Sequence, residues 1–554
     1  MNRKLFPPLA VCVAAVLGIF LFLGSRGLNE PDEGRFAEAA REMSLQSSWL
    51  FPHLAGVPHL QKPPMTFWIT AMCIKWFGVN EWAVRLPSAF AALGIIILTM
   101  HLAGLLFGPT IAWRAGMILL SSILFFVMAR VITTDMLLSF WITAAIVAYI
   151  HYTKCGSILA LVLFYICLGL GFLTKGPMAY LVPLSAVIPW VIVTRKEQKL
   201  PGGMWHWIPG ILVTLILSAS WFVVLFRHYP GLLEYYVQYE FIDRIASNTH
   251  DRAKPLWFYS LVMFGGLLPW SILLPRMIGD QWRQRGSRRT PAFWLLAGWL
   301  LIPWLVLHLV TSKLPTYILP LFPPMAILLA HEWDRLYVRG TIEVRSFAVI
   351  VAIATAALPL VFGQIGEHHA HQMLRQPFFV LSACLIGLGW IALFIKTATP
   401  SRASSPLIGL AVMMILTLVL VSSQIENVLQ QMGKSLLPVI MDIKNAKNDH
   451  PKAQLVAGNM KKFGLDFYLQ EPIIRSRNRA EATLPIPDNI KSLYVDDVYD
   501  HVRIHQQDEF IILISRYFLP DPMPDDWEIQ NDYGKTLLVY RPGDRIRSAS
   551  PHGR

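Results

Sequence analysis

The sequence predicts an α-helical protein that crosses a membrane many times and ends in a small α/β domain. Hydrophobic residues make up 55% of its 554 residues, charged residues only 15%, and the mean hydropathy is +0.47. Since a helix needs about 20 mostly apolar residues to cross a bilayer, apolar runs of that length identify the spans. These runs stop near residue 425, where the composition turns polar. We therefore predict a membrane domain over residues 1–425 and a second domain over residues 426–554.

Thirteen apolar runs are long enough to be spanning helices. They lie at about residues 6–23, 86–107, 111–129, 135–152, 157–174, 177–194, 207–226, 256–274, 292–311, 314–331, 346–363, 377–395 and 406–422. The first run lacks a convincing small-residue cleavage site, so we expect a retained anchor. A long first loop, residues 24–85, follows it. Within this loop, Pro64–Phe77 is apolar but short and contains Lys75, which favours an interfacial or re-entrant helix.

The basic residues predict the orientation in the membrane. With the N-terminus inside, the inner loops hold most of the Lys and Arg, and the opposite short loops hold little beyond Arg130, Lys175, Lys313 and Arg375. This asymmetry follows the positive-inside rule, and an odd number of spans then places the C-terminal domain outside. Most of the net charge of +13 is explained in this way. We therefore expect membrane lipids, and no nucleic acid, as partners.

The C-terminal domain has the pattern of a small α/β fold. Val428–Lys447 has helical periodicity, whereas Ala453–Met460, Phe510–Leu519 and Thr536–Pro542 are apolar runs typical of strands, separated by Pro, Asn and Asp turn signals. No catalytic cluster is evident in this region. The simplest interpretation is a lid or a stabilising appendage.

Polar residues of the predicted outer face come from five separate loops. They are Asp32, Glu33, Arg35, Glu38, His59 and Lys62 in the first loop, Asp135 at the start of the fourth span, Lys175, then His250 and Arg252, and finally Lys313 and Tyr317. Ionisable groups at membrane depth are costly and usually face a cavity or a partner. Their concentration on one face predicts a single cavity that binds an anionic ligand.

Three of these residues also have structural interpretations that involve the membrane helices. Thr134 or Asp135 begins a predicted helix, where such side chains often cap the first turn. Lys175 and Lys313 are long side chains near helix ends, where lysines commonly extend towards the interface. Each of these structural interpretations is an alternative to a role in the predicted anion-binding cavity.

The first loop and the segment before the eighth span leave similar alternatives open. Arg35 and Glu38 are spaced to form an i,i+3 ion pair on a solvated helix. His59 and His250 are more often ordinary surface histidines than metal ligands. The acidic pair Asp32–Glu33, together with the KPP and TKGP segments on the same side, favours a site.

Several short motifs resemble a known family. PDE-x-R is followed by A-E-x-x-R-E-M, H-L-x-G-x-x-x-x-x-KPP, TTD, LTKGP and SKLPTY. Their order and topological placement resemble the bacterial lipid-linked glycosyltransferases of the GT-C fold, which are related to the protein O-mannosyltransferases. Among these, the 4-amino-4-deoxy-L-arabinose transferases of lipid A are the most similar. The resemblance covers the membrane region through about Pro320.

The resemblance implies transfer of a sugar from a polyprenyl (undecaprenyl) phosphate at the periplasmic face of a bacterial inner membrane, with lipid A as the expected acceptor. Negative charge gathers on the departing phosphate, and cations in a dry site stabilise it. The predicted catalytic carboxylates are Asp32, which orients or deprotonates the acceptor, and Asp135. The predicted substrate-binding residues are Glu33, Arg35, Lys62, Lys175, Arg252, Lys313 and Tyr317.

Two departures from the family pattern concern a divalent metal. Gln61 stands where the aminoarabinose transferases commonly have Glu, and His250-Asp251-Arg252 stands where they commonly have His-Arg or His-Lys. If a metal is bound, His250 is the remaining predicted ligand.

Other functions remain open from the sequence. A polyprenyl-phosphate sugar transferase acting on another lipid, glycan or protein acceptor has the same motifs. A transporter or flippase also needs many spans, but transporters place polar groups near the midplane, often with repeats. Here the charges gather at one face and no halves repeat, which favours an enzyme over a transporter or a sensor.

Overall fold

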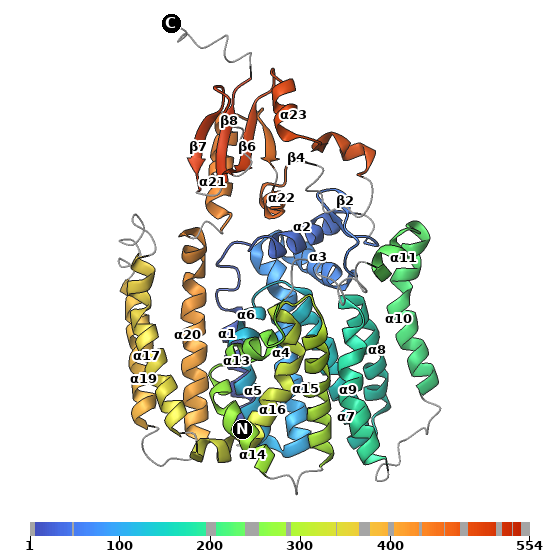
Figure 1. Cartoon of the computed structure of the whole chain (residues 1–554), viewed down its shortest axis with the longest axis vertical. Helices are drawn as coiled ribbons and strands as arrows, with labels where there is room; N and C mark the ends of the chain where they lie inside the picture. Colours follow the sequence, from blue (N-terminus) through green and yellow to red (C-terminus); the bar gives the residue numbers. More distant parts are fainter. Residues whose placement is uncertain are drawn as a thin grey trace. The chain divides into compact units, whose positions relative to one another are not determined.

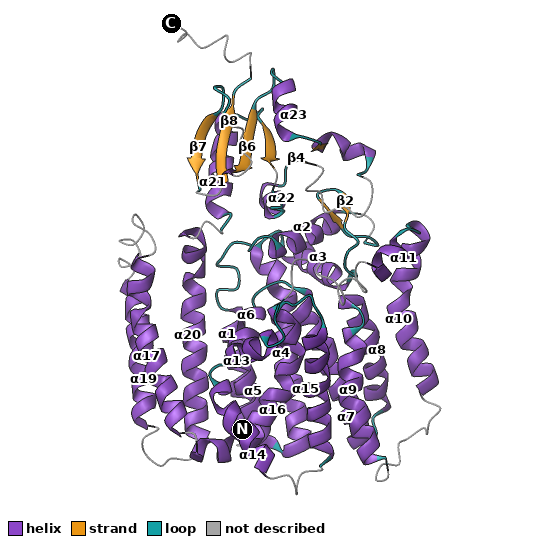
Figure 2. Ribbon diagram, in the orientation of Figure 1, coloured by secondary structure: helices purple, strands orange, loops and turns teal. Residues whose placement is uncertain are grey.

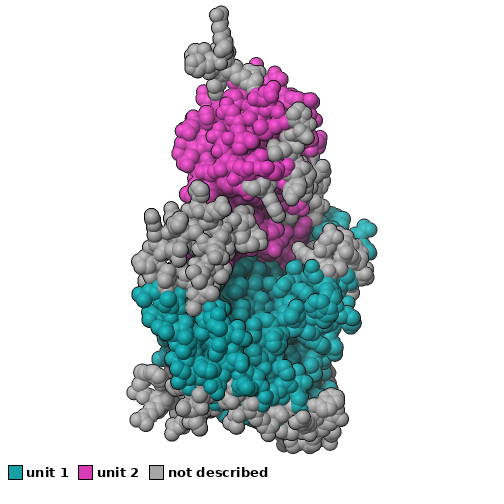
Figure 3. All heavy atoms as spheres, turned by 60° about the vertical axis from the view of Figure 1, so that its left-hand side comes forward, with its two compact units in different colours: residues 1–23, 85–423 teal, residues 24–84, 424–554 magenta. Residues whose placement is uncertain are grey.

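The computed structural model divides the chain into two compact units. It describes residues 6–46, 49–195, 207–238, 254–283, 290–339, 341–364, 377–396, 404–431, 435–458, 460–476, 486–516, 523–533 and 536–543. One unit, here called the helical unit, contains Met1–Leu23 and Arg85–Ser423. The other, here called the mixed unit, contains Gly24–Val84 and Gln424–Arg554 (Figure 3). The predicted domains differ from this division, because they place the first loop in the membrane domain.

The helical unit is built from helices that pack side by side. Its elements are α1 (Phe6–Phe20), α4 (Glu81–Phe107), α5 (Pro109–Leu120), α6 (Ile123–Met128), α7 (Thr134–Cys155), α8 (Ile158–Lys175), α9 (Met178–Thr194), α10 (Trp207–His228), α11 (Leu232–Tyr235), α13 (Phe258–Gly266), η3 (Trp270–Leu273), α14 (Leu274–Arg283), α15 (Pro291–Leu309), η4 (Pro315–Leu321), α16 (Phe322–Arg339), α17 (Thr341–Gln364), α19 (Pro377–Lys396) and α20 (Ser404–Gln431). The first turn of α4 and the end of α20 belong to the mixed unit. Helix α7 packs against α8 and α9, α9 packs against α15, and α17 packs against α19 (Figure 1).

Each predicted span coincides with helical structure, although some spans are broken. The predicted span 111–129 consists of α5 and α6, and the span 256–274 contains α13 and η3, followed by α14. Among the described residues, six helices are long and apolar enough to cross a membrane alone. The pair Phe258–Gly266 and Trp270–Gly279, bent by 113°, makes a seventh if it is one span. The total of thirteen stays a prediction.

Exposed apolar side chains identify the surface of the helical unit that faces lipid. On α10, Ile208, Ile211, Leu212 and Ile216 are 50–62% exposed. Soluble proteins rarely present such continuous apolar faces to water. The chain is therefore a multi-pass membrane protein.

The first loop folds as a helical hairpin with a small β-hairpin inserted. Its elements are α2 (Asp32–Leu45), β1 (His53–Leu54), β2 (Val57–Pro58) and α3 (Met65–Phe77). The turn between the two strands places Ala55 and Gly56 at φ values of 51° and 78°, a conformation in which glycine carries no Cβ penalty. Helices α2 and α3 pack together, and the rings of Phe36 and Phe67 stack 5.5 Å apart. The predicted short helix at Pro64–Phe77 is thus confirmed as a helix.

The C-terminal part of the mixed unit is a mixed sheet with helices on both faces (Figure 2). Its elements are α21 (Leu437–Asp449), β3 (Gln454–Gly458), α22 (Gly464–Leu469), β4 (Ile473–Ser476), η6 (Asp488–Leu493), β5 (Tyr494–Val495), α23 (Val498–Ile504), β6 (Phe510–Ser515), β7 (Glu528–Asp532) and β8 (Thr536–Arg541). The strand order is β5-β4-β3-β6-β8-β7. The first four strands are parallel, and β8 and β7 are antiparallel to their neighbours.

The two faces of this sheet explain which strands the sequence reveals. Residues from α21 and α22 cover one face, and residues from α23 cover the other. Strands buried on both faces read as continuous apolar runs, so the predictions for β3, β6 and β8 are confirmed. The exposed strand β7 and the short strands β4 and β5 were not predicted. The helical periodicity of Val428–Lys447 corresponds to two helices, because α20 ends at Gln431 and α21 begins at Leu437.

Candidate functional site

The predicted catalytic residue Asp32 begins helix α2. Its Oδ1 accepts a hydrogen bond from Nη2 of Arg35 at 2.6 Å, and the Asp32 side chain is 57% exposed. A carboxylate in the first helical turn is stabilised by the exposed N–H groups there. The predicted pair Arg35–Glu38 is wrong, because Glu38 is buried and forms two hydrogen bonds with Arg41. Asp32 therefore combines a fixed helix position with an accessible carboxylate.

Its neighbour Glu33 points into the protein instead. Only 1% of the residue is exposed, and its Oε2 accepts hydrogen bonds from Arg26 at 2.6 Å and from the backbone N–H of Asn29 at 3.0 Å. These contacts tie the start of α2 to the segment before it. Glu33, predicted to bind substrate, thus stabilises the loop that carries Asp32.

The KPP segment lies between β2 and α3. Lys62 is half-buried there, and His59 is 3% exposed with its ring edge-on to Phe67 at 6.0 Å. The interpretation of His59 as a surface histidine is therefore wrong. Lys62 stays a predicted phosphate ligand.

A second polar cluster lies within the helical unit, where three segments meet. Asp135 is the second residue of α7, and its carboxylate forms an ion pair with Lys175, the last residue of α8. Thr316 of η4 donates a hydrogen bond to the other oxygen of Asp135 at 2.9 Å. The ammonium of Lys175 lies 4.3 Å from the ring centre of Tyr317, which is a cation–π distance. Three of the predicted residues, Asp135, Lys175 and Tyr317, are thus brought together.

These contacts exclude the interpretation of Asp135 as a helix cap. The residue at the N-cap position of α7 is Thr133, and its side chain makes no capping hydrogen bond. The carboxylate of Asp135 instead accepts from side chains of α8 and η4. At the start of α7, Asp135 therefore links this helix to α8 and η4.

Lys313 lies in the turn between α15 and η4. It is 3% exposed, and its Nζ donates to the carbonyl oxygen of Lys254 at 3.3 Å. Burial lowers the pKa of this lysine. A lysine that merely extends to the interface keeps its ammonium in water, so that interpretation is wrong for Lys313. A buried ammonium with a carbonyl partner is suited to binding an anion.

Two predicted residues lie outside the described ranges, namely Arg252 and His250. Within those ranges, no three His, Cys, Asp or Glu side chains come together as metal ligands do.

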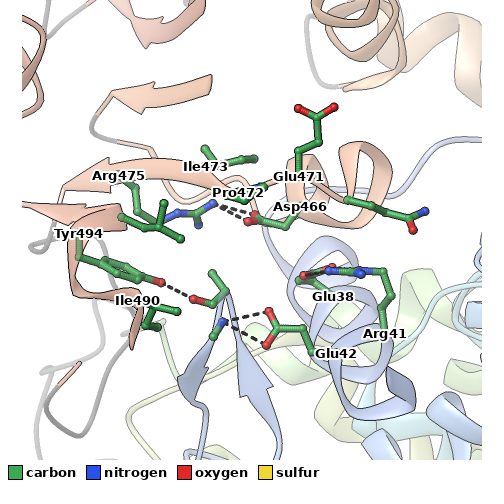
Figure 4. A pocket seen from close by; sticks show the side chains of 14 residues that line it. Glu38, Arg41, Glu42, Asp466, Glu471, Pro472, Ile473, Arg475, Ile490 and Tyr494 are labelled. Carbon is green, nitrogen blue, oxygen red and sulfur yellow. Dashed lines mark hydrogen bonds and ion pairs between the residues drawn. The ribbon is translucent and has the colours of Figure 1, made fainter. Parts of the chain in front are cut away.

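A cavity of about 250 Å³ lies within the mixed unit, between α2 and the C-terminal sheet (Figure 4). Glu38 neutralises Arg41 on one side, and Asp466 neutralises Arg475 on the other through contacts of 2.7 and 2.8 Å. Glu42 accepts two hydrogen bonds from the backbone N–H of Gly56. Since both arginines are already paired, this cavity is poorly suited to a phosphate.

The sequence did not single out Thr316, which holds Asp135 in place. Its signal was present, because Thr316 directly precedes Tyr317 in the SKLPTY motif. Arg26, which pairs with Glu33, carried no comparable signal because it lies outside every motif.

The fold is similar to that of solved structures of ArnT from Cupriavidus metallidurans. The structure bound to undecaprenyl phosphate has a TM-score of 0.77 and 22% identity, and the match covers 96% of this chain and 97% of that one. The apo structure has a TM-score of 0.78 and 23% identity at the same coverage. These values confirm the predicted GT-C fold.

The sequence matches point to the same group of proteins. Residues 61–223 match the family model described as dolichyl-phosphate-mannose-protein mannosyltransferase. The undecaprenyl phosphate-alpha-4-amino-4-deoxy-L-arabinose arabinosyl transferase of Edwardsiella ictaluri is 34% identical over 340 residues, and the match spans 60% of either chain. The protein of the same name from Enterobacter sp. is 31% identical over 397 residues, which cover 69% of this chain and 70% of that one. The chain therefore belongs to the family of undecaprenyl phosphate-alpha-4-amino-4-deoxy-L-arabinose arabinosyl transferases.

Proposed function

We propose that this protein transfers 4-amino-4-deoxy-L-arabinose from undecaprenyl phosphate to lipid A. The observation that carries the proposal is the 31% identity to an arabinosyl transferase over 70% of that protein's length. The carboxylates and cations of both units add chemical support, because transfer from a phosphate donor needs charge stabilisation.

The proposed step exchanges the bond between the sugar and the donor phosphate for a bond between the sugar and the acceptor. An acceptor oxygen forms a bond to the anomeric carbon of the sugar, and the bond from that carbon to the donor phosphate oxygen breaks. The electron pair of the broken bond leaves with undecaprenyl phosphate. An acceptor hydroxyl must also give up its proton to a base, whereas an ionised phosphate acceptor needs only to be positioned.

The predicted residues fit these requirements in different ways. Asp32 is accessible enough to orient or deprotonate the acceptor. Arg35, Lys62 and Lys313 each have the positive charge that stabilises a departing phosphate. The pair of Asp135 and Lys175 provides a polar wall on which sugar hydroxyls can form hydrogen bonds.

A reconstituted transfer assay tests the function directly. Purified protein is mixed with undecaprenyl-phosphate aminoarabinose and lipid A, and mass spectrometry follows the mass added to lipid A. We expect modified lipid A with this donor and none with a polyprenyl-phosphate mannose. Turnover of the mannose donor onto a protein acceptor, without lipid A modification, contradicts the proposal.

Removing either first-loop cation should weaken donor binding. Each of Arg35→Ala and Lys62→Ala deletes a charge-assisted contact worth about 1.5–3 kcal/mol, which corresponds to roughly a tenfold to hundredfold loss of affinity. Binding of the lipid donor is measured by calorimetry on folded protein in detergent. The matched control is Arg503→Ala, since Arg503 pairs with Asp500 at an i,i+3 spacing just as Arg35 pairs with Asp32. Donor affinity equal to that of the control in both variants removes these residues from the site.

We also propose that the protein lies in the bacterial inner membrane with Asp32 and residues 426–554 on the periplasmic side. The support is the concentration of basic residues in the loops of the opposite face. A reporter that is active only in the periplasm, fused after residue 430, should therefore be active. Activity of a cytoplasmic reporter at the same junction contradicts this orientation.

A further inference from the structure

The segment that leads into α2 is held by the C-terminal part of the mixed unit. The backbone N–H of Gly27 donates to Oε2 of Glu426 at 2.7 Å, and the N–H of Leu28 donates to the hydroxyl oxygen of Tyr468 at 2.9 Å. The Tyr468 hydroxyl in turn donates to Glu81 at 2.8 Å. Residues about 400 positions apart in the chain thus fix the backbone just before the catalytic motif.

Glu30 makes a further and more specific contact in the same place. Its Oε1 accepts a hydrogen bond from the backbone N–H of Gly464, at the start of α22, at 2.6 Å. Two glycines leave the space that this carboxyl group fills. A Cβ atom on Gly34 would lie 2.1 Å from Oε1, and a Cβ atom on Gly464 would lie 2.4 Å from it. Any larger residue at either position must displace the carboxyl group.

We propose that Glu30 is a positioning residue that holds Asp32 in its working place by anchoring the start of α2 to Gly464. The proposal rests on the proposed function of Asp32. Glu30 lies two residues before Asp32, and only Pro31 separates the anchored side chain from the helix. This positioning role gives the C-terminal domain a function in the reaction, beyond that of a lid or an appendage.

The surroundings of Glu30 favour an uncharged side chain. Its Oε2 is buried and has no hydrogen-bond partner among the described residues. The pKa of Glu30 is raised to about 7, chiefly by burial. Asp466 contributes to this rise, whereas the N–H of Gly464 and the charges of Lys462 and Arg35 reduce it. Glutamine keeps the accepting oxygen and carries no charge. Glu30→Gln is therefore the conservative variant.

The expected effect follows from the geometry of catalysis. A displacement of about 1 Å in a catalytic group can cost a factor of roughly 10² in rate. Glu30→Ala removes the anchor and should lower kcat about tenfold to a hundredfold, with a smaller change in KM for the donor. Glu30→Gln keeps the hydrogen bond from Gly464 and should stay within about threefold of wild type. If Glu30 were needed only for stability, the fully folded Glu30→Ala protein would have the kcat and KM of wild type.

The control variant removes a different hydrogen-bonded carboxylate of the same domain. Asp442 accepts hydrogen bonds from Tyr533 and Asn531 and lies outside the segment that contacts residues 27–30. Asp442→Ala should leave kcat unchanged. If it lowers kcat as much as Glu30→Ala does, the effect is a general weakening of the domain and the positioning role is wrong.

A second variant tests the anchor while leaving Glu30 in the chain. Gly464→Ala places a Cβ atom against Oε1, so it should lower kcat as Glu30→Ala does. Added to Glu30→Ala, it should have little further effect, because its remaining close neighbour is the flexible side chain of Leu436. Multiplicative losses in the double variant contradict the anchor.

The titration of Glu30 gives an independent readout. Because folding raises its pKa, the wild-type protein should lose stability as the pH rises from about 4.5 through about 7. Glu30→Gln should lose less over the same range, as measured by thermal unfolding. An identical pH dependence in both proteins contradicts the buried position of Glu30.

The test separates this proposal from the proposed function on which it rests. If Asp32→Asn abolishes transfer while Glu30→Ala is as active as wild type, Asp32 is catalytic and the positioning role of Glu30 is wrong. If Asp32→Asn is as active as wild type, the assigned role of Asp32 fails, and the positioning role fails with it.

Discussion

Replacing Asp32 with asparagine should lower sugar transfer by about 10²–10⁴-fold, the usual contribution of a general base. The substitution keeps the size of the side chain and one accepting oxygen but removes its charge and basicity. Folding should barely change, since an exposed ion pair such as Asp32–Arg35 contributes only about 0–1 kcal/mol. Donor binding should be unchanged or tighter, because Arg35 loses the carboxylate that competes with the phosphate.

A matched control makes this result specific. Asp500 lies in the first turn of α23 and pairs with Arg503 at an i,i+3 spacing, so it repeats the local geometry of Asp32. Asp500→Asn should therefore transfer sugar at the wild-type rate. Rates are measured at saturating donor, with protein quantified after chromatography. Transfer by Asp32→Asn at the rate of the control ends the assignment of the catalytic carboxylate to this loop.

The membrane helices were predictable because lipid imposes a simple rule on the sequence. A span must be apolar over about 20 residues, and each predicted run coincides with helical structure. The breaks inside two runs were not predicted, because they depend on local packing. The bend between α13 and η3 falls where Gly265, Gly266 and Pro269 interrupt the apolar run. From the sequence alone, these residues indicate only that a helix is less stable here, and they do not predict a bend.

The sequence predicted which polar residues belong to the clusters better than it predicted which of them form ion pairs with each other. The sequence singled out Asp135, Lys175 and Tyr317, since charged residues beside spans are rare and costly. Which carboxylate meets which cation depends on helix rotation and on contacts between distant segments. Arg35 therefore pairs with Asp32, and the predicted partner Glu38 faces inward to Arg41. The anchor at Glu30 was not predictable for the same reason, because its partner lies 434 positions away.

Asp135→Ala should produce the largest loss of stability among the predicted site residues. The side chains of Asp135 and Lys175 are only 9% and 15% exposed, so the substitution leaves a buried ammonium without its carboxylate. Breaking one partner of a buried pair costs about 3–5 kcal/mol. Thermal unfolding in detergent measures this loss. Asp488→Ala is the control, because Asp488 and its partner Lys491 are 94% and 57% exposed, so that breaking their ion pair leaves no buried charge.

Stability and activity should separate when both partners are changed. In Asp135→Asn combined with Lys175→Met, no charge remains unpaired, so most of the lost stability should return. Transfer should stay low, because the polar wall proposed to bind the sugar is gone. If transfer recovers together with stability, the pair of Asp135 and Lys175 is only a structural tie between α7 and α8. If stability recovers alone, the pair acts on the substrate, as its place beside Thr316 and Tyr317 predicts.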